Sequence, residues 1–403
     1  MIEKLKIGNI CNITTGKLDS NQFVLGGKYP FYTCAPSPLT IDSYSFDDSV
    51  ILIAGNNAAG NFHINRFDGK FDAYQRTYIL TAKPDFDLDY IFYSLKLELK
   101  RLKEKAQGSQ TKFLTMPILN DISIAKLDLY SQQKISSVLS ALDSKIELNN
   151  RINTELEAMA KTLYDYWFVQ FDFPDKDGKP YKTSGGKMVW NEDLKRAIPE
   201  GWTSGTLLDL GEIIGGSTPP REIDDYFTSN GTAWITPKDL SLNTGNKFIT
   251  RGELDVSDKG IKAASLNIMP KGTILLSSRA PIGYLAISRE HVTTNQGFKS
   301  FVPRNGYSTE YVYYSIQNMI PTIENNSAGS TFKEVSGSTL KAIKVGLPDT
   351  EIIQNYTSMV ENIFNRQDNL ERQNQTLAEL RDWLLPMLMN GQVQVKSHYV
   401  LNR

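Results

Sequence analysis

The chain has 403 residues, a length that suits two or three domains better than a single hydrophobic core. Hydrophobic residues make up 40% of it and charged residues 22%, and no apolar run approaches the roughly 18 residues of a transmembrane helix, so we expect a soluble globular protein. The formal net charge of −1 excludes a basic surface spread over the whole chain, so any contact with DNA requires a locally sorted face.

Cysteine and histidine, which often serve as nucleophiles, bases or metal ligands, are sparse. Cys11 and Cys34 are too few for a disulfide framework and form no CxxC pair for zinc, and the three histidines are scattered. Neither a Walker A loop nor an Asn-Pro-Pro-aromatic methyltransferase motif occurs. Residues 1–16 lack the apolar core of a signal peptide. We therefore expect a cytoplasmic recognition or scaffold protein that holds no metal or cofactor of its own.

Two parts of the chain resemble each other at a nearly constant offset. Because 354 − 133 = 221, Gln133 and Gln354 define this offset. The same 221 positions separate Asn153 from Asn374, Leu156 from Leu377, Gln75 from Gln296, Tyr93 from Tyr314, Gly108 from Gly329 and Lys112 from Lys333. An offset shared by so many residue types predicts two copies of one unit, each a globule followed by a long helix.

The first globule, residues 1–130, shows short apolar runs between turn residues. Residues 49–54 and 76–80 are predicted strands, and the polar residues 56–61 between them a loop. Residues 87–107 are predicted to be helical, and their later part is rich in lysine and arginine. That basic run has two interpretations, a solvated helix face or a contact with phosphates.

Small polar segments recur in both copies. Residues 108–113 and 329–333 combine Gly, Ser, Thr and one Lys, and they precede predicted strands at 119–127 and 340–347. Such a segment suits a loop against a phosphate backbone, although an ordinary turn uses the same residues. Gln75 and Gln296 occupy corresponding positions of the two copies, and glutamine can recognise adenine with two hydrogen bonds, whereas a turn-forming glutamine is more common.

A nuclease motif is the main enzymatic alternative. Asp85, Glu98 and Lys100 have the spacing of a carboxylate–lysine motif that binds magnesium, but Glu98 and Lys100 fall in the middle of the predicted helix rather than on a strand. The second copy has Asn318 and Met319 near the corresponding positions.

Two long segments, residues 132–167 and 351–389, carry apolar residues in steps of three and four, as in a coiled coil. A helix of about 36 residues is roughly 54 Å long, on the order of one and a half turns of B-DNA. Polar residues at seam positions, such as Asn149, are expected to fix the register. The predicted seam includes Ile135, Leu142, Ile152, Leu156, Met159, Leu163, Tyr166, Met359, Leu370, Leu377, Leu380 and Leu384.

Six segments result from these patterns, and the same repeat logic selects the residues expected to touch DNA. The segments are a first globule (1–130), a first helix (131–170), an exposed connector (171–200), a second globule (201–348), a second helix (349–391) and a tail (392–403). The expected DNA-binding residues are Lys17, Asn56, Asn57, Gln75, Arg76, Ser109, Lys112, Ser217, Thr218, Lys238, Arg279, Gln296, Ser330, Thr331 and Lys333.

Several stretches resemble the specificity subunit of type I restriction–modification systems. Residues 168–202 resemble the central region of that family, Gly329-Ser330-Thr331 with the following strand resembles the end of its target recognition domain, and residues 384–391 (LLPMLMNG) resemble its C-terminal signature. The resemblance covers essentially the whole chain, and its most specific part is the central region.

This resemblance implies an α+β fold in which two similar mixed α/β target recognition domains are separated by two long antiparallel coiled-coil helices, with an internal pseudo-two-fold repeat. It implies a non-catalytic subunit whose two domains each recognise one half of a bipartite double-stranded DNA target, while the helices set the spacing. Two methylation subunits and motor–endonuclease subunits would be the partners, and AdoMet, ATP and Mg²⁺ would belong to them. The alternatives are the magnesium nuclease and a coiled-coil scaffold with no DNA role.

Overall fold

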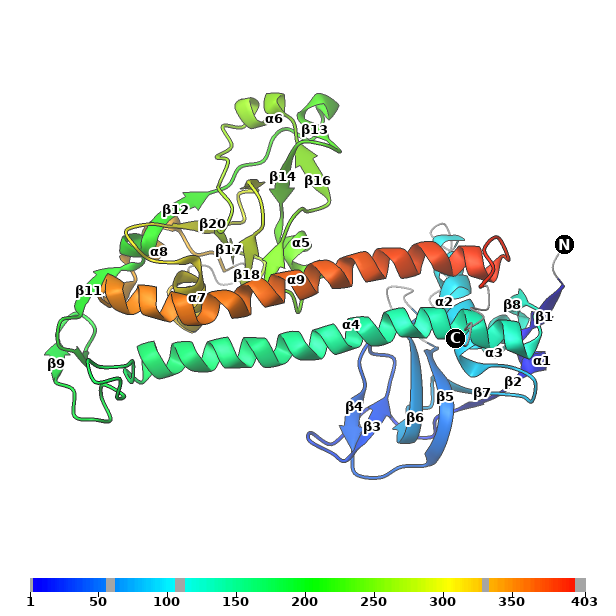
Figure 1. Ribbon diagram of the computed structural model, residues 1–403. Helices are drawn as coiled ribbons and strands as arrows, with labels where there is room; N and C mark the ends of the chain where they lie inside the picture. The colour runs from blue at the N-terminus through cyan, green and yellow to red at the C-terminus, as the bar shows by residue number, and fades with distance from the viewer. Residues whose placement is uncertain (1–2, 56–61, 106–112, 328–332, 396–403) are drawn as a thin grey trace, which may run out of the picture. The chain divides into compact units, whose positions relative to one another are not determined.

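The structure is a computed structural model that describes residues 3–55, 62–105, 113–327 and 333–395 (Figure 1). The chain forms two compact units, residues 1–148 with 374–403 and residues 149–373. Two long helices, α4 (Leu129–Tyr164) and α9 (Thr350–Met389), contribute one part to each unit. Each unit combines a sheet with helices, which confirms the α+β class. Within the described ranges, no helix is both long and apolar enough to span a bilayer.

A six-stranded sheet forms the centre of the first unit, in the order β2-β7-β5-β6-β3-β4. Neighbouring strands are antiparallel except for β3 and β6. Ile51 and Ile53 of β5 pack into one core and Val50 and Leu52 into another, because successive side chains of a strand face opposite sides. The strands are β2 (Cys11–Thr15), β3 (Tyr29–Tyr32), β4 (Leu39–Ile41), β5 (Phe46–Ala54), β6 (Ile64–Ala73) and β7 (Thr77–Ala82).

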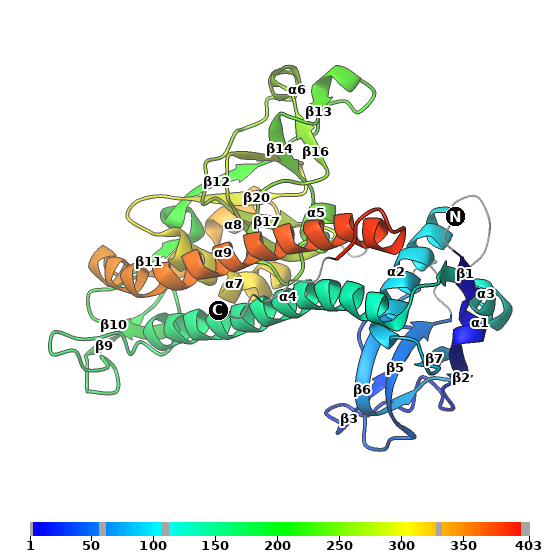
Figure 2. The same ribbon diagram turned by 45° about the vertical axis from the view of Figure 1, so that its right-hand side comes forward.

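Helix α2 (Leu88–Lys105) covers one face of this sheet, beside β5 and β6 (Figure 2). The Asp87 carboxylate caps it by accepting the Tyr90 N–H at 2.7 Å, and Tyr90, Ile91, Leu95 and Leu99 are buried at helical spacing.

Short elements complete the first unit. They are β1 (Lys4–Lys6), α1 (Ile7–Ile10), α3 (Met116–Asp121) and β8 (Ser123–Ala125), with β1 paired to β8. The strand predicted at 119–127 is therefore wrong in its first part, because Pro117 occupies the first turn of α3.

Two sheets build the second unit. A five-stranded sheet has the order β12-β20-β17-β18-β15 and a four-stranded sheet the order β13-β16-β14-β19. On β17, Leu275 joins the core that contains residues of β14 and β19, and Ile274 and Leu276 join the core beneath α7. The strands are β12 (Gly211–Gly215), β13 (Phe227–Thr228), β14 (Thr232–Ile235), β15 (Phe248–Ile249), β16 (Leu254–Val256), β17 (Ile274–Ser278), β18 (Ile282–Ser288), β19 (Val292–Thr294) and β20 (Lys299–Pro303).

Helix α7 (Thr309–Asn325) joins the five-stranded sheet to the long helices within this unit. Tyr311 and Tyr314 of α7 lie in one aromatic cluster with Tyr164 of α4 and Tyr356 of α9, with ring centroids 5.6–6.2 Å from that of Tyr164. The remaining helices of this unit are η3 (Leu207–Leu210), η4 (Asp224–Tyr226), α5 (Pro237–Leu242), α6 (Asp258–Ala263) and α8 (Gly337–Ala342).

The segment predicted as an exposed connector has buried ends. After α4, a π-helical turn η2 (Asp165–Val169) leads to Phe171 and Phe173, whose side chains are buried beside Trp202. Between Phe173 and Trp202 in the sequence, β9 (Met188–Asn191) and β10 (Arg196–Pro199) form an antiparallel hairpin. β11 (Thr203–Thr206) then pairs with β21 (Lys344–Leu347) as β1 pairs with β8.

The elements repeat with two offsets. α2, α3, β8 and α4 begin at residues 88, 116, 123 and 129, and α7, α8, β21 and α9 begin at 309, 337, 344 and 350, which is 221 later in every case. β2 and β12 begin at 11 and 211, so their offset is 200. The second copy therefore gains 221 − 200 = 21 residues in the region that forms its four-stranded sheet.

Within each unit the long helices pack antiparallel. In the first unit, the Asp143 carboxylate of α4 bonds to Arg381 of α9 at 2.6 Å, and Leu139 shares a core with Leu385. In the second unit, Asn149 Nδ2 donates to Gln373 Oε1 at 3.5 Å, so two side-chain amides face each other between the long helices.

The seam differs from the predicted one. Ile135 and Leu370 are buried, and Leu142, Ile152, Leu156, Leu163, Leu377 and Leu384 are half-buried. Met159, Tyr166, Met359 and Leu380 are exposed, which contradicts their predicted place in the seam. Each long helix packs against a globule as well as its partner helix, so its buried stripe is wider than a coiled-coil seam and includes Leu139, Ala160, Tyr164, Val360, Phe364 and Gln367.

Candidate nucleic-acid interface

In the first unit, the turn between β6 and β7 lies against the loop that follows β2. The backbone N–H of Lys17 donates to the Ala73 carbonyl oxygen at 3.2 Å, and that of Gln75 donates to the Leu18 carbonyl oxygen at 2.9 Å. The Gln75 side-chain amide donates to Asp19 Oδ1 at 2.9 Å. Lys17, Gln75 and the neighbouring Arg76 are exposed, so the structure brings these three predicted residues together at one edge of the sheet.

The second unit repeats this arrangement at the turn that follows β19. The Ser217 N–H donates to the Thr294 carbonyl oxygen at 3.0 Å, as Lys17 does to Ala73. The Thr218 hydroxyl bonds to Gln296 Oε1, so Gln296 is held by the adjacent loop as Gln75 is. The predicted residues Ser217, Thr218 and Gln296 therefore also lie together.

Glycine is required where the two loops cross. A Cβ added to Gly16 would lie 2.1 Å from the Ala73 carbonyl oxygen, and one added to Gly216 would lie 2.1 Å from the Asn295 carbonyl oxygen. Both obstructions are backbone atoms, so any side chain there would push the loop away from the glutamine turn.

Two further segments join the same edge in both units. In the first, Gly55 N–H donates to the Arg76 carbonyl oxygen at 2.9 Å and Leu114 N–H donates to the Gly55 carbonyl oxygen at 3.0 Å. In the second, Ser278 N–H donates to the Gly297 carbonyl oxygen at 2.8 Å, and Val335 N–H donates to the Ser278 carbonyl oxygen at 3.0 Å. Together with the loop at Lys17 or Ser217, four segments distant in the sequence thus meet through the same backbone hydrogen bonds in each copy.

Two of the predicted cations in the second unit already have acidic partners. The Arg279 guanidinium lies 3.8 Å from the Glu334 carboxylate, next to the exposed Lys333, and Lys238 forms an ion pair with Glu253. These pairs are partly or largely exposed and hence weak, so a phosphate group can compete for either cation. Six predicted residues, Asn56, Asn57, Ser109, Lys112, Ser330 and Thr331, lie outside the described residues.

Sequence reasoning missed Arg221. Its guanidinium lies 5.7 Å from the centroid of the Trp234 ring, and the Trp234 indole N–H donates to the Ser217 carbonyl oxygen at 3.0 Å. Trp234 is 1% exposed and Arg221 is exposed, so a buried ring holds an arginine beside the Ser217 loop. The signal was present in the sequence, because Arg221 directly follows the Ser-Thr-Pro-Pro segment that corresponds to the loop at Lys17.

The basic run on α2 is divided between the two interpretations. Lys100 and Lys103 are exposed, whereas Lys96 is half-buried and its burial lowers the pKa of its ammonium. Lys96 lies near Asp143 and is therefore part of the contact between α2 and the long helices, rather than of an open phosphate-binding face.

The proposed nuclease residues do not form an active site. Asp85 is exposed in the loop before α2, and Glu98, which lies on α2, forms an ion pair with Arg101 one turn later. Among the described residues, no group of three His, Cys, Asp or Glu side chains is placed to hold a metal ion. The part of the chain that the structure describes therefore gives no support to the nuclease alternative.

The arrangement is suited to recognition. At the sheet edge of the first unit, an exposed amide, an exposed arginine and an exposed lysine stand on tight, hydrogen-bonded loops, which limits the entropy lost on binding. Glutamine can bond an adenine edge, arginine a guanine edge, and lysine a phosphate.

Comparison with known proteins identifies the family. A family model described as type I restriction modification DNA specificity domain matches residues 2–158 and 199–380. The specificity subunit of the type I restriction enzyme MjaIX from Methanocaldococcus jannaschii is 40% identical over 200 residues, which are 48% of this chain and 46% of that protein, so the match spans about half of each.

Other relatives match over more of their length. The specificity subunit of the type I restriction enzyme EcoDI from Escherichia coli is 25% identical over 94% of this chain and 85% of its own length. The crystal structure of the S subunit of a type I restriction–modification system from M. genitalium has the same fold, with a TM-score of 0.61, 17% identity and 96% coverage of both chains. With the family model covering both repeats, the chain belongs to the type I restriction modification DNA specificity domain family.

Proposed function

We propose that this chain is the DNA-reading subunit of a type I restriction–modification complex and performs no chemistry itself. Each globule recognises one half of a bipartite target in double-stranded DNA. The observation that carries this proposal is the recurrence of the four-segment edge, with Gln75 in one copy and Gln296 in the other, in a chain of the DNA specificity family.

The partners follow from the same assignment. Two methylation subunits dock on the long helices, and motor–endonuclease subunits join for cleavage, all in the cytoplasm. AdoMet, ATP and Mg²⁺ bind to those partners. The specificity chain supplies the choice of DNA sequence and the position of each methylation subunit on it.

The long helices act as the spacer between the two half-sites. α4 has 36 residues and α9 has 40. Removal of one heptad from each helix, which shortens both by about 10 Å, should change the number of unspecified base pairs between the half-sites and leave the half-sites themselves unchanged. A changed half-site sequence would refute the spacer role.

The decisive experiment is methylome sequencing of the host with and without this chain. The expected result is one methylated motif with two short half-sites and a fixed gap, which disappears when the gene is deleted and returns when it is restored. Survival of every methylated motif in the deletion strain would refute the proposal. A purified chain that cuts DNA with Mg²⁺, and loses this activity on Glu98→Ala, would establish the nuclease instead.

A further inference from the structure

Two buried cations of the second globule lie at its contact with the long helices. Lys247 immediately precedes β15 and Arg289 immediately follows β18, and β15 and β18 are parallel neighbours at one end of the sheet. Their side chains are only 3% and 6% exposed. A lysine and an arginine this deeply buried require partners, because an unpaired charge in a protein interior is very costly.

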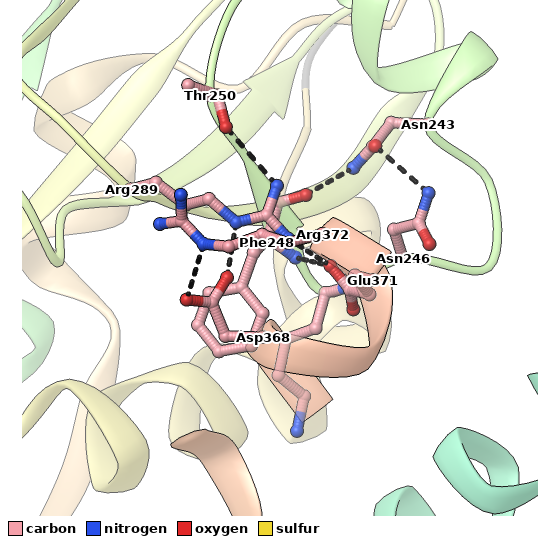
Figure 3. A network of polar contacts seen from close by, with 9 residues as sticks. Asn243, Asn246, Phe248, Thr250, Arg289, Asp368, Glu371 and Arg372 are labelled. Atoms are coloured by element: carbon pink, nitrogen blue, oxygen red, sulfur yellow. Dashed lines mark hydrogen bonds and ion pairs between the residues drawn. The ribbon is translucent and has the colours of Figure 1, made fainter. Parts of the chain in front are cut away.

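Helix α9 supplies the partners on one side (Figure 3). One Glu371 oxygen accepts the backbone N–H of Lys247 at 2.8 Å, and the other accepts that of Phe248 at 3.1 Å and Arg289 Nη2 at 2.8 Å. Arg289 Nε also bonds to Asp368, one turn earlier on α9. Arg289 thus bridges the carboxylates of Asp368 and Glu371. The Glu371 carboxylate also accepts two backbone N–H groups at the edge strand β15.

Helix α4 supplies a partner on the other side. Lys247 Nζ lies 2.5 Å from the Glu157 carboxylate of α4 and 2.9 Å from both the Gln367 side-chain oxygen of α9 and the Tyr314 hydroxyl of α7. One ammonium group therefore joins both long helices to the globule. All these residues belong to the second unit.

The directional character of this network distinguishes it from ordinary core packing. The same contact contains the apolar side chains of Phe248 and Phe364. Further apolar side chains in place of the charged ones would avoid the desolvation cost of the buried ion pairs. Burial lowers the pKa of Lys247 and raises that of Glu371, because desolvation disfavours the charged form of each group. Apolar surfaces tolerate small rotations, whereas this set of hydrogen bonds is satisfied in one orientation only.

The first copy uses a simpler contact at the corresponding place. Tyr93, the counterpart of Tyr314, donates its hydroxyl to Asp143 of α4 at 2.8 Å, and Asp143 also bonds to Arg381 of α9. Lys247 lies between β12 and α7, the part of the second copy that is 21 residues longer than its counterpart in the first.

We propose that the network of Lys247, Arg289, Glu157, Asp368 and Glu371 is a positioning device that fixes the orientation of the second recognition globule on the long helices, so that the complex accepts one gap between half-sites. This inference rests on the proposed function. If the globule could tilt, its half-site would shift along the DNA relative to the other half-site, and targets with a longer or shorter gap would be accepted.

The test uses the full chain assembled with its methylation subunits and carrying Lys247→Met or Glu371→Gln. Methylation rates are measured on DNA with the native gap and with the gap changed by one base pair, both half-sites intact. Val360→Ala is the matched control, because Val360 is fully buried in the same unit and lies on α9 outside the network. Arg289→Lys, which keeps the charge and loses the bridge between carboxylates, is the milder variant to use where the others fail to fold.

For each protein the measured quantity is the methylation rate on altered-gap DNA divided by the rate on native-gap DNA. In the network variants this ratio should be about 5- to 10-fold higher than in the wild type, which is the lower end of the coupling factors found between distant sites of a protein. Base preference within each half-site should not change, and Val360→Ala should lower all rates equally. Gap ratios equal to those of the control, for folded network variants including Arg289→Lys, would overturn the inference. A wild-type complex without a bipartite target would instead overturn the proposed function.

Discussion

Removing the two glutamine side chains one at a time tests whether each globule recognises its own half-site. Gln75 and Gln296 occupy the same place in the two copies, 221 residues apart, and each is held by a neighbouring loop residue. Gln75→Ala should relax base preference in one half-site only, and Gln296→Ala in the other half-site only. The two variants are therefore reciprocal controls for each other.

The size of the effect follows from the lost contact. A glutamine that bonds a base edge through its amide contributes about 1–3 kcal/mol of discrimination, which corresponds to roughly 5- to 150-fold in relative methylation rate. Both side chains are exposed, so their removal should change the free energy of unfolding by less than about 0.5 kcal/mol.

Salt dependence separates base contacts from phosphate contacts. Neither glutamine is charged, so the slope of log affinity against log salt concentration should stay the same in both variants. Arg76→Ala should reduce that slope by about 0.9 if Arg76 neutralises one phosphate. An arginine that recognises guanine would instead relax one base position by about 1–3 kcal/mol.

The assay is methylation of a DNA library by the complete complex. The gap is kept constant while each position of both half-sites is randomised, and the methylated fraction is sequenced. Gln133→Ala, an exposed glutamine on α4 in the first unit, is the matched control. A uniform fall in rate on all sequences, or a Gln75 variant that alters both half-sites, would refute base recognition by these turns.

Three further predictions concern stability and register. Leu139→Ala should cost about 2–5 kcal/mol of unfolding free energy because Leu139 is fully buried, whereas Met159→Ala, at an exposed site, should stay within about 0.5 kcal/mol; chemical denaturation measures both. Asp172→Asn should cost about 1–2 kcal/mol at pH 7, since its carboxylate accepts the N–H and hydroxyl of Thr183, each at 2.7 Å. These bonds lower the pKa of Asp172, so its contribution is present above about pH 4 and is lost as the pH falls through the folded-state pKa; the two proteins should converge in acid denaturation. Asn149→Leu should raise the melting temperature and add a second gap class to the methylated motifs, and an unchanged single gap would show that the register is set elsewhere.

Local patterns predicted the regular elements well. The continuous apolar run of β5 reflects burial on both faces of the strand, and the helical spacing of Ile91, Leu95 and Leu99 reflects one buried face of α2. The 221-residue offset predicted the start of α7 from that of α2, because repeated residues fold into repeated elements. The N-cap of α2 also depends on neighbouring residues alone, because the Asp87 carboxylate accepts the N–H of Tyr90, three residues later.

Long-range features were harder to predict. A heptad seam assumes one partner helix, but Tyr164 of α4 packs against both α7 and α9. The buried side of α4 therefore differs from the predicted seam, and Met159 is exposed to solvent. Recurrence at the 221-residue offset selected Gln75 and Gln296 as candidates, whereas the Arg221–Trp234 contact and the Lys247 network join residues that are distant in the sequence and that no repeat relates.

The polar residues of the long helices have a common consequence for register. Asn149 is fully buried and donates to Gln373, and Gln367 donates to the Asn153 carbonyl oxygen at 3.4 Å. A slip of one heptad would bring Asn149 opposite residue 366 or 380, an arginine or a leucine, and neither offers an acceptor for its amide. Apolar seam residues would tolerate such a slip at small cost. The amides therefore disfavour the slipped pairings more than they stabilise the native one, which is the property a spacer needs when its length determines which DNA sequence is recognised.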